Sequence, residues 1–282
     1  MKMKKLEKET GDPKPTDQIF VTRKLYRESA LTLLAWPRAI LLQLAHPLVA
    51  AGVADHSNFR KDPWQRFIHT FDAALFLVFG SEVQARTAID RISRVHSRVR
   101  GVLSEPVGRF PAGAPYDATD PRLLLWVFAT TIDSELQVGR RYLGGLSDEE
   151  EERYYSETKP SAIALGVPPR MMPATLAELR RWIDDTLDSD ISIGSFQRDL
   201  ASSVLYPTLR FVPRLALEPF VAITLGLLPA RVREEYGFRY GAVHRRIFDM
   251  SPQVLRLTLP VAPSPLRYMP LARARHLGIT LE

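Results

Sequence analysis

Apolar residues recur with helical spacing along most of the chain. From Asp62 to Gly80 a capping aspartate, a proline in the first turn, a long apolar run and a terminal glycine predict one helix. A second helix is expected from about Ser81 to Leu103, because its apolar positions recur every three or four residues and form one stripe that faces the core. This stripe consists of Ile89, Ile92, His96, Val99 and Leu103.

The same pattern, broken by proline and glycine, continues through the remaining chain. No convincing strand with alternating polarity is present, so the predicted fold is all-α. We expect a single domain of roughly ten helices over residues 18–282, after a charged, disordered lead-in over residues 1–17. Capping boxes are expected at Ser147 with Glu150 and at Thr175 with Glu178. Other predicted helices cover residues 17–35, 38–52 with a bend at His46-Pro47, 119–143, 147–166, 175–188 and 241–259.

Composition narrows the class of protein. The chain of 282 residues is 45% hydrophobic and 25% charged, as in ordinary globular proteins. It has no cysteine, which excludes disulfides, thiolate metal ligands and covalent attachment of haem. The first residues lack an apolar core, so they predict neither a signal peptide nor an anchor, and the apolar run Ala39–Ala54 is too short to span a bilayer. We expect a cytoplasmic protein.

Positive charge is concentrated near the C-terminus. Residues 231–275 hold nine arginines and only Glu234, Glu235 and Asp249, a net charge of +6. Such a region attracts nucleic acid, an anionic membrane or an acidic ligand, although a solvated surface is the plainer interpretation. No helix-turn-helix pattern or aromatic ladder is present, so nucleic acid is not expected. Peripheral contact with a membrane stays open.

The histidines are the main candidates for chemistry. Four of the six, His46, His56, His69 and His96, lie within 51 residues. His96 interrupts the apolar stripe, and Arg100 is expected one turn beyond it. A buried imidazole next to a guanidinium suits an iron cofactor with anionic groups, for which non-covalent haem is the candidate. A lone histidine on an apolar helix face is, however, more often a hydrogen-bonded core residue.

His46 has two further interpretations. Together with Asp55 and His56 it could form a facial triad for non-haem iron. Alternatively, the bend expected at Pro47 and Gly52 turns His46 into a cavity between helices. Among the acidic residues, Asp133 is expected to form an interior salt bridge to an arginine. The run Glu149–Glu152 is expected to be a solvated face at the start of a helix.

Several long motifs resemble one family. The segment LLQLAHPLVAAGVADHSNFRKDPWQRFIHTFDAALFLVFGS is similar to the catalytic domain shared by rubber oxygenase (latex clearing protein) and the membrane-bound oxygenase MpaB. The similarity extends through RISRVHSRVRG, YDATDPRLLLWVFATTIDS, LGVPP and LLPARVREEYG, over roughly residues 25–275. This resemblance implies an all-α fold around a b-type haem. It also implies cleavage of carbon–carbon double bonds with dioxygen.

The resemblance assigns roles to individual residues. His96 and Arg100 match the family's His-x-x-x-Arg motif, which makes His96 the proximal haem ligand. Arg66, His69 and Thr70 match Arg-x-x-Lys-Thr, with His69 in place of a lysine that can cap the iron. We therefore predict His69, Thr70 and Arg66 as catalytic, His96, Arg100, Arg66 and His46 as cofactor-binding, and His96 and His69 as metal ligands.

Three departures limit what can be transferred from the family. Small residues such as Ala50 and Ala51 stand near the position of the rubber enzyme's catalytic glutamate, and Phe128 stands where many relatives have a histidine. There is no secretion signal, so an extracellular polymer is not the expected substrate. The sequence therefore predicts a haem b-dependent oxygenase that acts on dioxygen and a small apolar, isoprenoid or lipid-like substrate. The alternatives are a non-catalytic haem binder or sensor, and a haem-free helical interaction protein.

Overall fold

Helices make up almost all the regular structure, as the sequence pattern predicts. The computed structural model of the protein describes residues 20–56, 63–207 and 213–280, without the side chains of residues 63–67. It contains fourteen α-helices in these ranges, where roughly ten were expected, because several connecting segments form short helices. The predicted lead-in, residues 1–17, lies outside the described residues. The α-helices are α1 (Phe20–Tyr26), α2 (Ser29–Ala45), α3 (Pro47–His56), α4 (Pro63–Phe79), α5 (Glu82–His96), α6 (Pro121–Tyr142), α7 (Asp148–Ala164), α8 (Leu176–Ser189), α9 (Ser195–Leu205), α10 (Glu218–Leu227), α11 (Ala230–Glu235), α12 (Ala242–Thr258), α13 (Ser264–Arg267) and α14 (Met269–His276).

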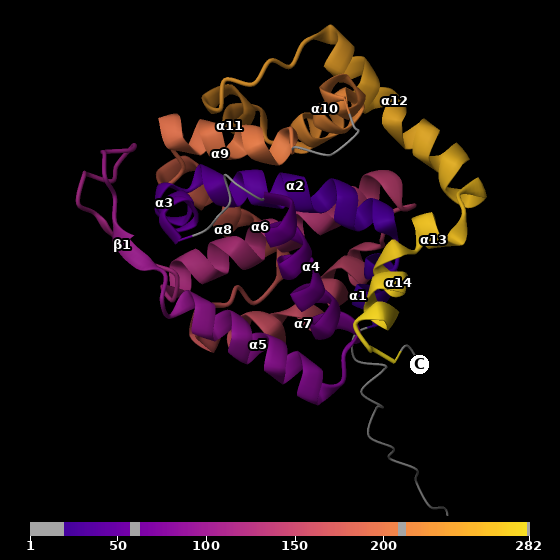
Figure 1. Ribbon diagram of the computed structural model, residues 1–282, viewed down its shortest axis with the longest axis horizontal. Coiled ribbons are helices and arrows are strands. Elements are labelled where there is room, and N and C mark those ends of the chain that lie inside the picture. The colour runs from indigo at the N-terminus through magenta and orange to yellow at the C-terminus, as the bar shows by residue number, and fades with distance from the viewer. Residues whose placement is uncertain (1–19, 57–62, 208–212, 281–282) are drawn as a thin grey trace, which may run out of the picture.

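The central element is α2, an apolar helix that is buried along most of its length. Figure 1 shows it crossing the middle of the molecule, with α6 below it and α9, α10 and α11 above. Its one buried guanidinium, that of Arg38, lies 2.7 Å from a carboxylate oxygen of Asp133 and also donates to Ser134 Oγ and to the Leu227 carbonyl. The predicted interior salt bridge of Asp133 is therefore confirmed. It ties α2 to α6.

The bend predicted at His46 is present. Helix α2 ends at Ala45, α3 begins at Pro47, and the two axes differ by 103°. Proline disfavours helical backbone in the residue before it, and His46 is accordingly extended, with φ −81° and ψ 120°. Within the described ranges no single helix is long and apolar enough to cross a membrane, although the bent pair α2–α3 passes a test of length and composition.

Other helix boundaries near the N-terminus differ from the prediction. The expected helix over residues 17–35 is two helices that separate at Arg27 and Glu28, and α2 continues through Pro37. Proline leaves the carbonyl of Leu33, four residues earlier, without its helical donor. The side chain of Leu33 is 41% exposed although its neighbours on α2 are buried, so only this side of the helix meets solvent.

Helix α5 ends earlier than predicted, at His96 rather than near Leu103. The next residues form a short hairpin in which β1 (Arg100–Val102) pairs antiparallel with β2 (Pro115–Asp117), and Arg100 lies opposite Asp117. Gly101 allows this close pairing because a Cβ there would collide with the Tyr116 hydroxyl. Arg100 is consequently on a strand rather than one helical turn beyond His96.

The acidic start of α7 is only partly solvated. Ser147 and Glu150 form the predicted capping box. Glu151, however, is 2% exposed and binds the guanidinium groups of Arg140 and Arg180. The expected solvated face is therefore wrong for Glu151, because two arginines from neighbouring helices surround it. A buried carboxylate needs such partners.

Candidate functional site

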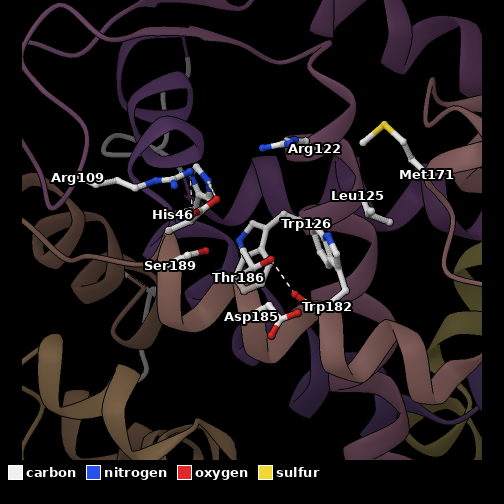
Figure 2. Close-up of a pocket in the computed structure, with 11 residues that line it drawn as sticks. His46, Arg109, Arg122, Leu125, Trp126, Met171, Trp182, Asp185, Thr186 and Ser189 are labelled. Carbon is white, nitrogen blue, oxygen red and sulfur yellow. Dashed lines mark hydrogen bonds and ion pairs between the residues drawn. The ribbon is translucent and has the colours of Figure 1, made fainter.

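A cavity of about 390 Å³ lies between α6 and α8, next to the bend between α2 and α3. Figure 2 shows His46 and Arg109 at one end and the indoles of Trp126 and Trp182 further along the wall. A volume of this size is at the lower end of those that hold small molecules. The remaining lining residues are Arg122, Leu125, Met171, Asp185, Thr186, Ser189 and Asp190.

His46 is held in the cavity wall by the backbone of the bend. Its ring Nδ1 accepts a hydrogen bond of 3.3 Å from the Leu48 N–H, which leaves Nε2 to carry the proton in the neutral imidazole. Burial lowers the pKa of His46 from its ordinary 6.5 to about 4, an effect that the nearby Asp190 carboxylate only partly opposes. At neutral pH His46 is therefore an uncharged imidazole. Its Nε2–H is the polar group available on the cavity side.

An ion pair stands beside this imidazole. The Asp190 Oδ2 atom lies 4.0 Å from His46 Nε2, and Asp190 Oδ1 lies 2.8 Å from the Arg109 guanidinium. The contact to Arg109 lacks hydrogen-bond geometry, so Asp190 Oδ1 is buried without an aligned donor among the described residues. Arg109 balances the charge of this oxygen, but the oxygen accepts no aligned hydrogen bond. It is available to a ligand that carries a donor.

The opposite wall is aromatic and apolar. Trp126 is 1% exposed, and its indole N–H donates to the Leu42 carbonyl, so the ring presents only its apolar face and edge to the cavity. The Trp182 ring lies 6.3 Å from it, centroid to centroid. An apolar wall with a few polar groups at one end is typical of small-molecule sites. Polar side chains, among them Arg122, Asp185 and Thr186, also line the cavity near the tryptophans, so it suits a ligand with an apolar part and several polar groups.

Helix α6 also carries a second buried titratable group, Glu135. The hydroxyls of Tyr26 and Tyr154 both donate to its carboxyl group in short hydrogen bonds. Burial nevertheless raises the pKa of Glu135 from 4.5 to about 7, because desolvation outweighs these bonds. This carboxyl group is thus close to half-protonated at neutral pH. It binds α1, α6 and α7 together rather than lining the cavity.

The facial triad considered for non-haem iron is not formed. His56 Nε2 lies 3.0 Å from the Arg100 carbonyl and 3.1 Å from the Tyr116 hydroxyl, which donates to Asp55. His46 lies at the other end of α3, ten residues or roughly 15 Å away at 1.5 Å per residue. In the described parts of the chain, no three histidine or acidic side chains are close enough to share a metal ion. The hypothesis of a cavity-lining His46 is the one that the geometry favours.

The α4–α5 hairpin carries the other predicted histidines. These consecutive helices are joined at Gly80 and Ser81, and Ser81 begins α5 with a capping box. His69 lies roughly 16 Å from this turn along α4, and His96 lies roughly 24 Å from it along α5, at 1.5 Å per residue. His69 and Thr70 are exposed on α4, and His96 is half-buried on α5.

Of the predicted arginines, Arg100 can be placed, and it does not lie in a closed pocket with these histidines. Arg100 is 62% exposed, donates to the Ser97 carbonyl and lies 3.7 Å from Asp117. The side chain of Arg66 lies outside the described residues. The expectation that the stripe of α5 faces the core is also only partly met, since Ile89, Ile92, His96 and Val99 are half-buried and Ala88 is the buried residue of α5.

The donor chemistry of this hairpin fits a haem. Helix α5 packs chiefly against α4, so its apolar stripe is incompletely covered within the described chain. A haem needs an apolar surface for its ring and one or two imidazoles for its iron. The half-covered stripe supplies the apolar surface. His96, with His69 on the neighbouring helix, supplies the imidazoles. Arg100 follows His96 by four residues, and it could bind a propionate if it gave up its weak ion pair with Asp117.

Sequence reasoning missed most of the cavity. Asp190 and Arg109 lie in segments that the sequence predicts only as a domain boundary and a loop. A single charged residue outside a helix belongs to no periodic pattern, so its burial could not be predicted. Trp126 and Trp182 carried a signal, since large aromatics on helices are usually buried. Their convergence depends on the packing of α6 against α8.

Comparison with known proteins identifies the family. Residues 23–257 match the family described as ER-bound oxygenase mpaB/B′/Rubber oxygenase, catalytic domain. The chain belongs to this family. Within this oxygenase catalytic domain lie the His46 cavity, the α4–α5 hairpin and most of α12, whereas α13 and α14 follow it. The resemblance predicted from the motifs is thereby confirmed.

Two mycobacterial relatives share much of this oxygenase domain. An uncharacterised protein of Mycobacterium bovis and one of Mycobacterium tuberculosis are each 26% identical to the chain over 232 residues. The aligned region covers 79% of this chain and 87% of each relative. No solved structure matches the chain.

Proposed function

We propose that this protein is a haem b-dependent oxygenase that acts on a small apolar, isoprenoid or lipid-like substrate. The observation that carries the proposal is the half-covered apolar stripe of α5, with His96 in it and His69 on the adjoining helix, in a chain of an oxygenase family. The aromatic cavity beside His46 supports an apolar substrate. Dioxygen is the second substrate.

Each residue has a defined task in this proposal. His96 ligates the iron, and Arg100 and Arg66 provide positive charge for the two propionates. Thr70 and His69, consecutive on α4, would provide a hydroxyl and an imidazole to the bound haem or to dioxygen. When bound, the haem supplies the dioxygen chemistry, while the chain supplies ligation, polarity and access.

His46 has a different role from the one predicted. Because its Nδ1 accepts the Leu48 N–H, its Nε2 keeps a proton and is not free to ligate iron. We assign it to the substrate: Nε2–H donates a hydrogen bond to a polar end of the ligand, while Trp126 and Trp182 contact the apolar part. The adjoining Asp190 carboxylate selects for a donor at that end.

A second function rests on His69. An imidazole binds ferric iron more firmly at neutral pH than the lysine that the family motif carries there. If both His69 and His96 ligate the iron, no coordination position is open, and the protein is a haem-binding sensor rather than an oxygenase. The observation that favours this alternative is histidine at position 69, where the family motif carries lysine.

One titration tests the proposal. The purified protein is mixed with haemin, and absorption spectra are taken before and after reduction by dithionite and after addition of carbon monoxide. We expect one equivalent of haem to give a sharp Soret band, and the reduced form to bind carbon monoxide. If the Soret band does not exceed that of a haemin-only control, the protein does not bind haem, and the interpretation as a haem-free interaction protein is the one supported. A Soret band without carbon monoxide binding would identify the sensor.

The spin state of the ferric form separates the two haem proteins further. Ligation by His69 gives a low-spin spectrum at neutral pH that becomes high-spin as acid protonates the imidazole. The variant His69→Ala should then be high-spin at all pH values and bind ligands faster. A wild type that is already high-spin at pH 8, with the same spectrum as His69→Ala, would show that His69 is not a ligand.

A further inference from the structure

The outer face of α12 is unusually apolar for a surface helix. In Figure 1 this helix runs along the edge of the molecule, from α10 toward α13. Of the fourteen large hydrophobic residues that are exposed in the described chain, seven lie between residues 243 and 269. They are Val243 (71% exposed), Met250 (52%), Val254 (51%), Leu257 (75%), Val261 (80%), Leu266 (70%) and Met269 (36%).

These residues form a continuous surface, which we call the α12 stripe. Val243, Met250, Val254 and Leu257, with the half-buried Ile247, recur at alternating four- and three-residue spacing, so they share one side of the helix. Val261 and Leu266 extend the exposed apolar surface past the end of the helix, into the segment before α14.

A different side of α12 holds it in place. Ser251 is buried and bonds to the Tyr142 hydroxyl, and the Phe248 ring lies under the Arg141 guanidinium at 3.8 Å. Leu255 packs against the main core. The α12 stripe is thus not part of the side of α12 that packs against the rest of the protein. It can be buried only against another molecule or a membrane.

Positive charge accompanies the stripe. Arg239, Arg245, Arg246 and Arg256 are exposed and make no ion pair with any described residue. At 100° per residue, Arg246 lies about 60° around the helix from Val243, and Arg245 and Arg256 lie about 140–160° away. Asp249 is the single acidic residue of the helix, at 3.9 Å from Arg141. Arg246 is therefore the one cation of α12 that borders the stripe, whereas Arg245 and Arg256 lie on the far side of the helix and add to its overall positive charge.

A lipid surface fits this combination better than a second copy of the chain. The alternating spacing alone would suit a helix pair, but such pairs use oppositely charged residues beside the seam. The residues beside this stripe are Arg246 and Gln253 on one side and Ser251 and Thr258 on the other, so a second copy would offer Arg246 no acidic partner. The exposed apolar residues also continue past α12, through Val261 in the 3-10 turn that follows and Leu266 in α13, so they do not follow one helical seam.

We propose that the α12 stripe is a peripheral membrane-binding surface that docks on anionic bilayers. The apolar side chains enter the boundary between headgroups and acyl chains, as in other amphipathic helices that lie in the plane of a membrane. Arg246 extends its guanidinium group from the border of the stripe to the anionic headgroups, and the other exposed arginines contribute long-range attraction to the anionic surface. This surface is separate from the His46 cavity and from the α4–α5 hairpin, and it does not depend on the bound cofactor.

Vesicle co-sedimentation of the full chain tests the proposal. Vesicles of phosphatidylcholine with phosphatidylglycerol should bind the protein at least tenfold more tightly than phosphatidylcholine alone, and added salt should weaken this binding. Leu257→Glu should reduce binding to the mixed vesicles at least tenfold. Arg246→Gln should reduce it less and flatten its salt dependence. Val83→Glu is the matched control, because Val83 is 73% exposed on α5, and it should bind as the wild type does.

Two results would overturn the proposal. The first is equal binding by the wild type, Leu257→Glu and Val83→Glu, which would show that the stripe does not meet lipid. The second is a wild-type dimer in light scattering that Leu257→Glu converts to a monomer without vesicles, which would make the stripe an interface between copies. Circular dichroism of each variant checks folding. Arg246→Gln keeps the experiment decisive should the glutamate variant not fold.

Discussion

His46 and His96 both lie on apolar segments of the sequence, yet the fold treats them differently. His46 is 4% exposed at the bend between two buried helices, and its pKa is about 4. His96 lies half-buried at the end of α5, a helix packed chiefly against one neighbour. Apolar periodicity thus identifies the side of a helix that avoids water. It does not identify what covers that side, which here is protein for His46 and, in our proposal, haem for His96.

The largest effect should be on haem binding, when each of the two histidines is replaced in turn by alanine. His96→Ala should abolish stoichiometric haem binding, because it removes the ligand on the proximal side of the iron. His46→Ala should keep the Soret band and the stoichiometry of the wild type. Absorption titration with haemin measures both. Wild-type binding by His96→Ala, or loss of binding in His46→Ala alone, would transfer the cofactor to the His46 cavity.

The two regions should also differ in how much their side chains stabilise the fold. Trp126→Ala in the cavity wall should lower the free energy of unfolding by about 3–5 kcal/mol, because it leaves a large void and an unpaired Leu42 carbonyl. Val95→Ala on α5, where the side chain is 56% exposed, should change it by less than about 0.5 kcal/mol. Urea denaturation of the haem-free protein measures both. Similar losses would mean that α5 is as well packed as the cavity wall.

The depressed pKa of His46 gives the cavity a pH dependence. In the unfolded chain His46 is protonated below about pH 6.5, whereas in the folded protein it is protonated only below about pH 4. The contribution of His46 to stability is therefore present above pH 6.5 and is lost as pH falls toward 4. The span between these pKa values corresponds to about 3 kcal/mol at most. His46→Gln should lack this component of acid destabilisation, measured by urea denaturation between pH 4 and 7.5. His56→Gln is the control.

Glu135 helps to separate the His46 effect from general acid denaturation, because the contribution of Glu135 to stability changes with pH in the opposite direction. Its folded pKa, about 7, lies above the ordinary 4.5, so its contribution to stability is present at low pH and lost as pH rises through 7. Glu135→Gln should remove a loss of stability as pH rises from 4.5 to about 7, while His46→Gln should remove a loss as pH falls from 6.5 to about 4. The same curve for both variants would show that neither assignment is correct.

Much of the fold could be predicted from sequence because it depends on local rules. Asp120 and Pro121 begin α6 as expected, Ser147 caps α7, and Pro47 separates α2 from α3. The errors arose where tertiary contacts override local preference. Pro37 stays inside a helix that is buried on most sides, and the strand pairing of Arg100 with Asp117 ends α5 early.

The candidate site was less predictable because its parts are distant in sequence. His46 and Asp190 are separated by six α-helices, α3 to α8, and no spacing rule connects them. The same holds for Glu151, whose run of four glutamates is typical of a solvated helix start, although Arg140 and Arg180 bury it. His69 and His96 could be placed on one hairpin from sequence, since their helices are consecutive. Their roles remain predictions.

The smallest expected effect concerns how easily α5 opens. A helix that packs chiefly on one neighbour should exchange its amide hydrogens through local opening, whereas α6, buried in the core, should exchange only through global unfolding. The Ser81 side chain accepts from the Gln84 N–H in the capping box of α5, and Ser81→Ala should cost about 1 kcal/mol. Exchange within α5 should then be about fivefold faster, at 1.4 kcal/mol per tenfold, with α6 unchanged. Hydrogen exchange measured by mass spectrometry resolves the two helices. Equal acceleration in both would show that α5 and α6 unfold together, and added haemin should slow α5 alone if its stripe is the haem surface.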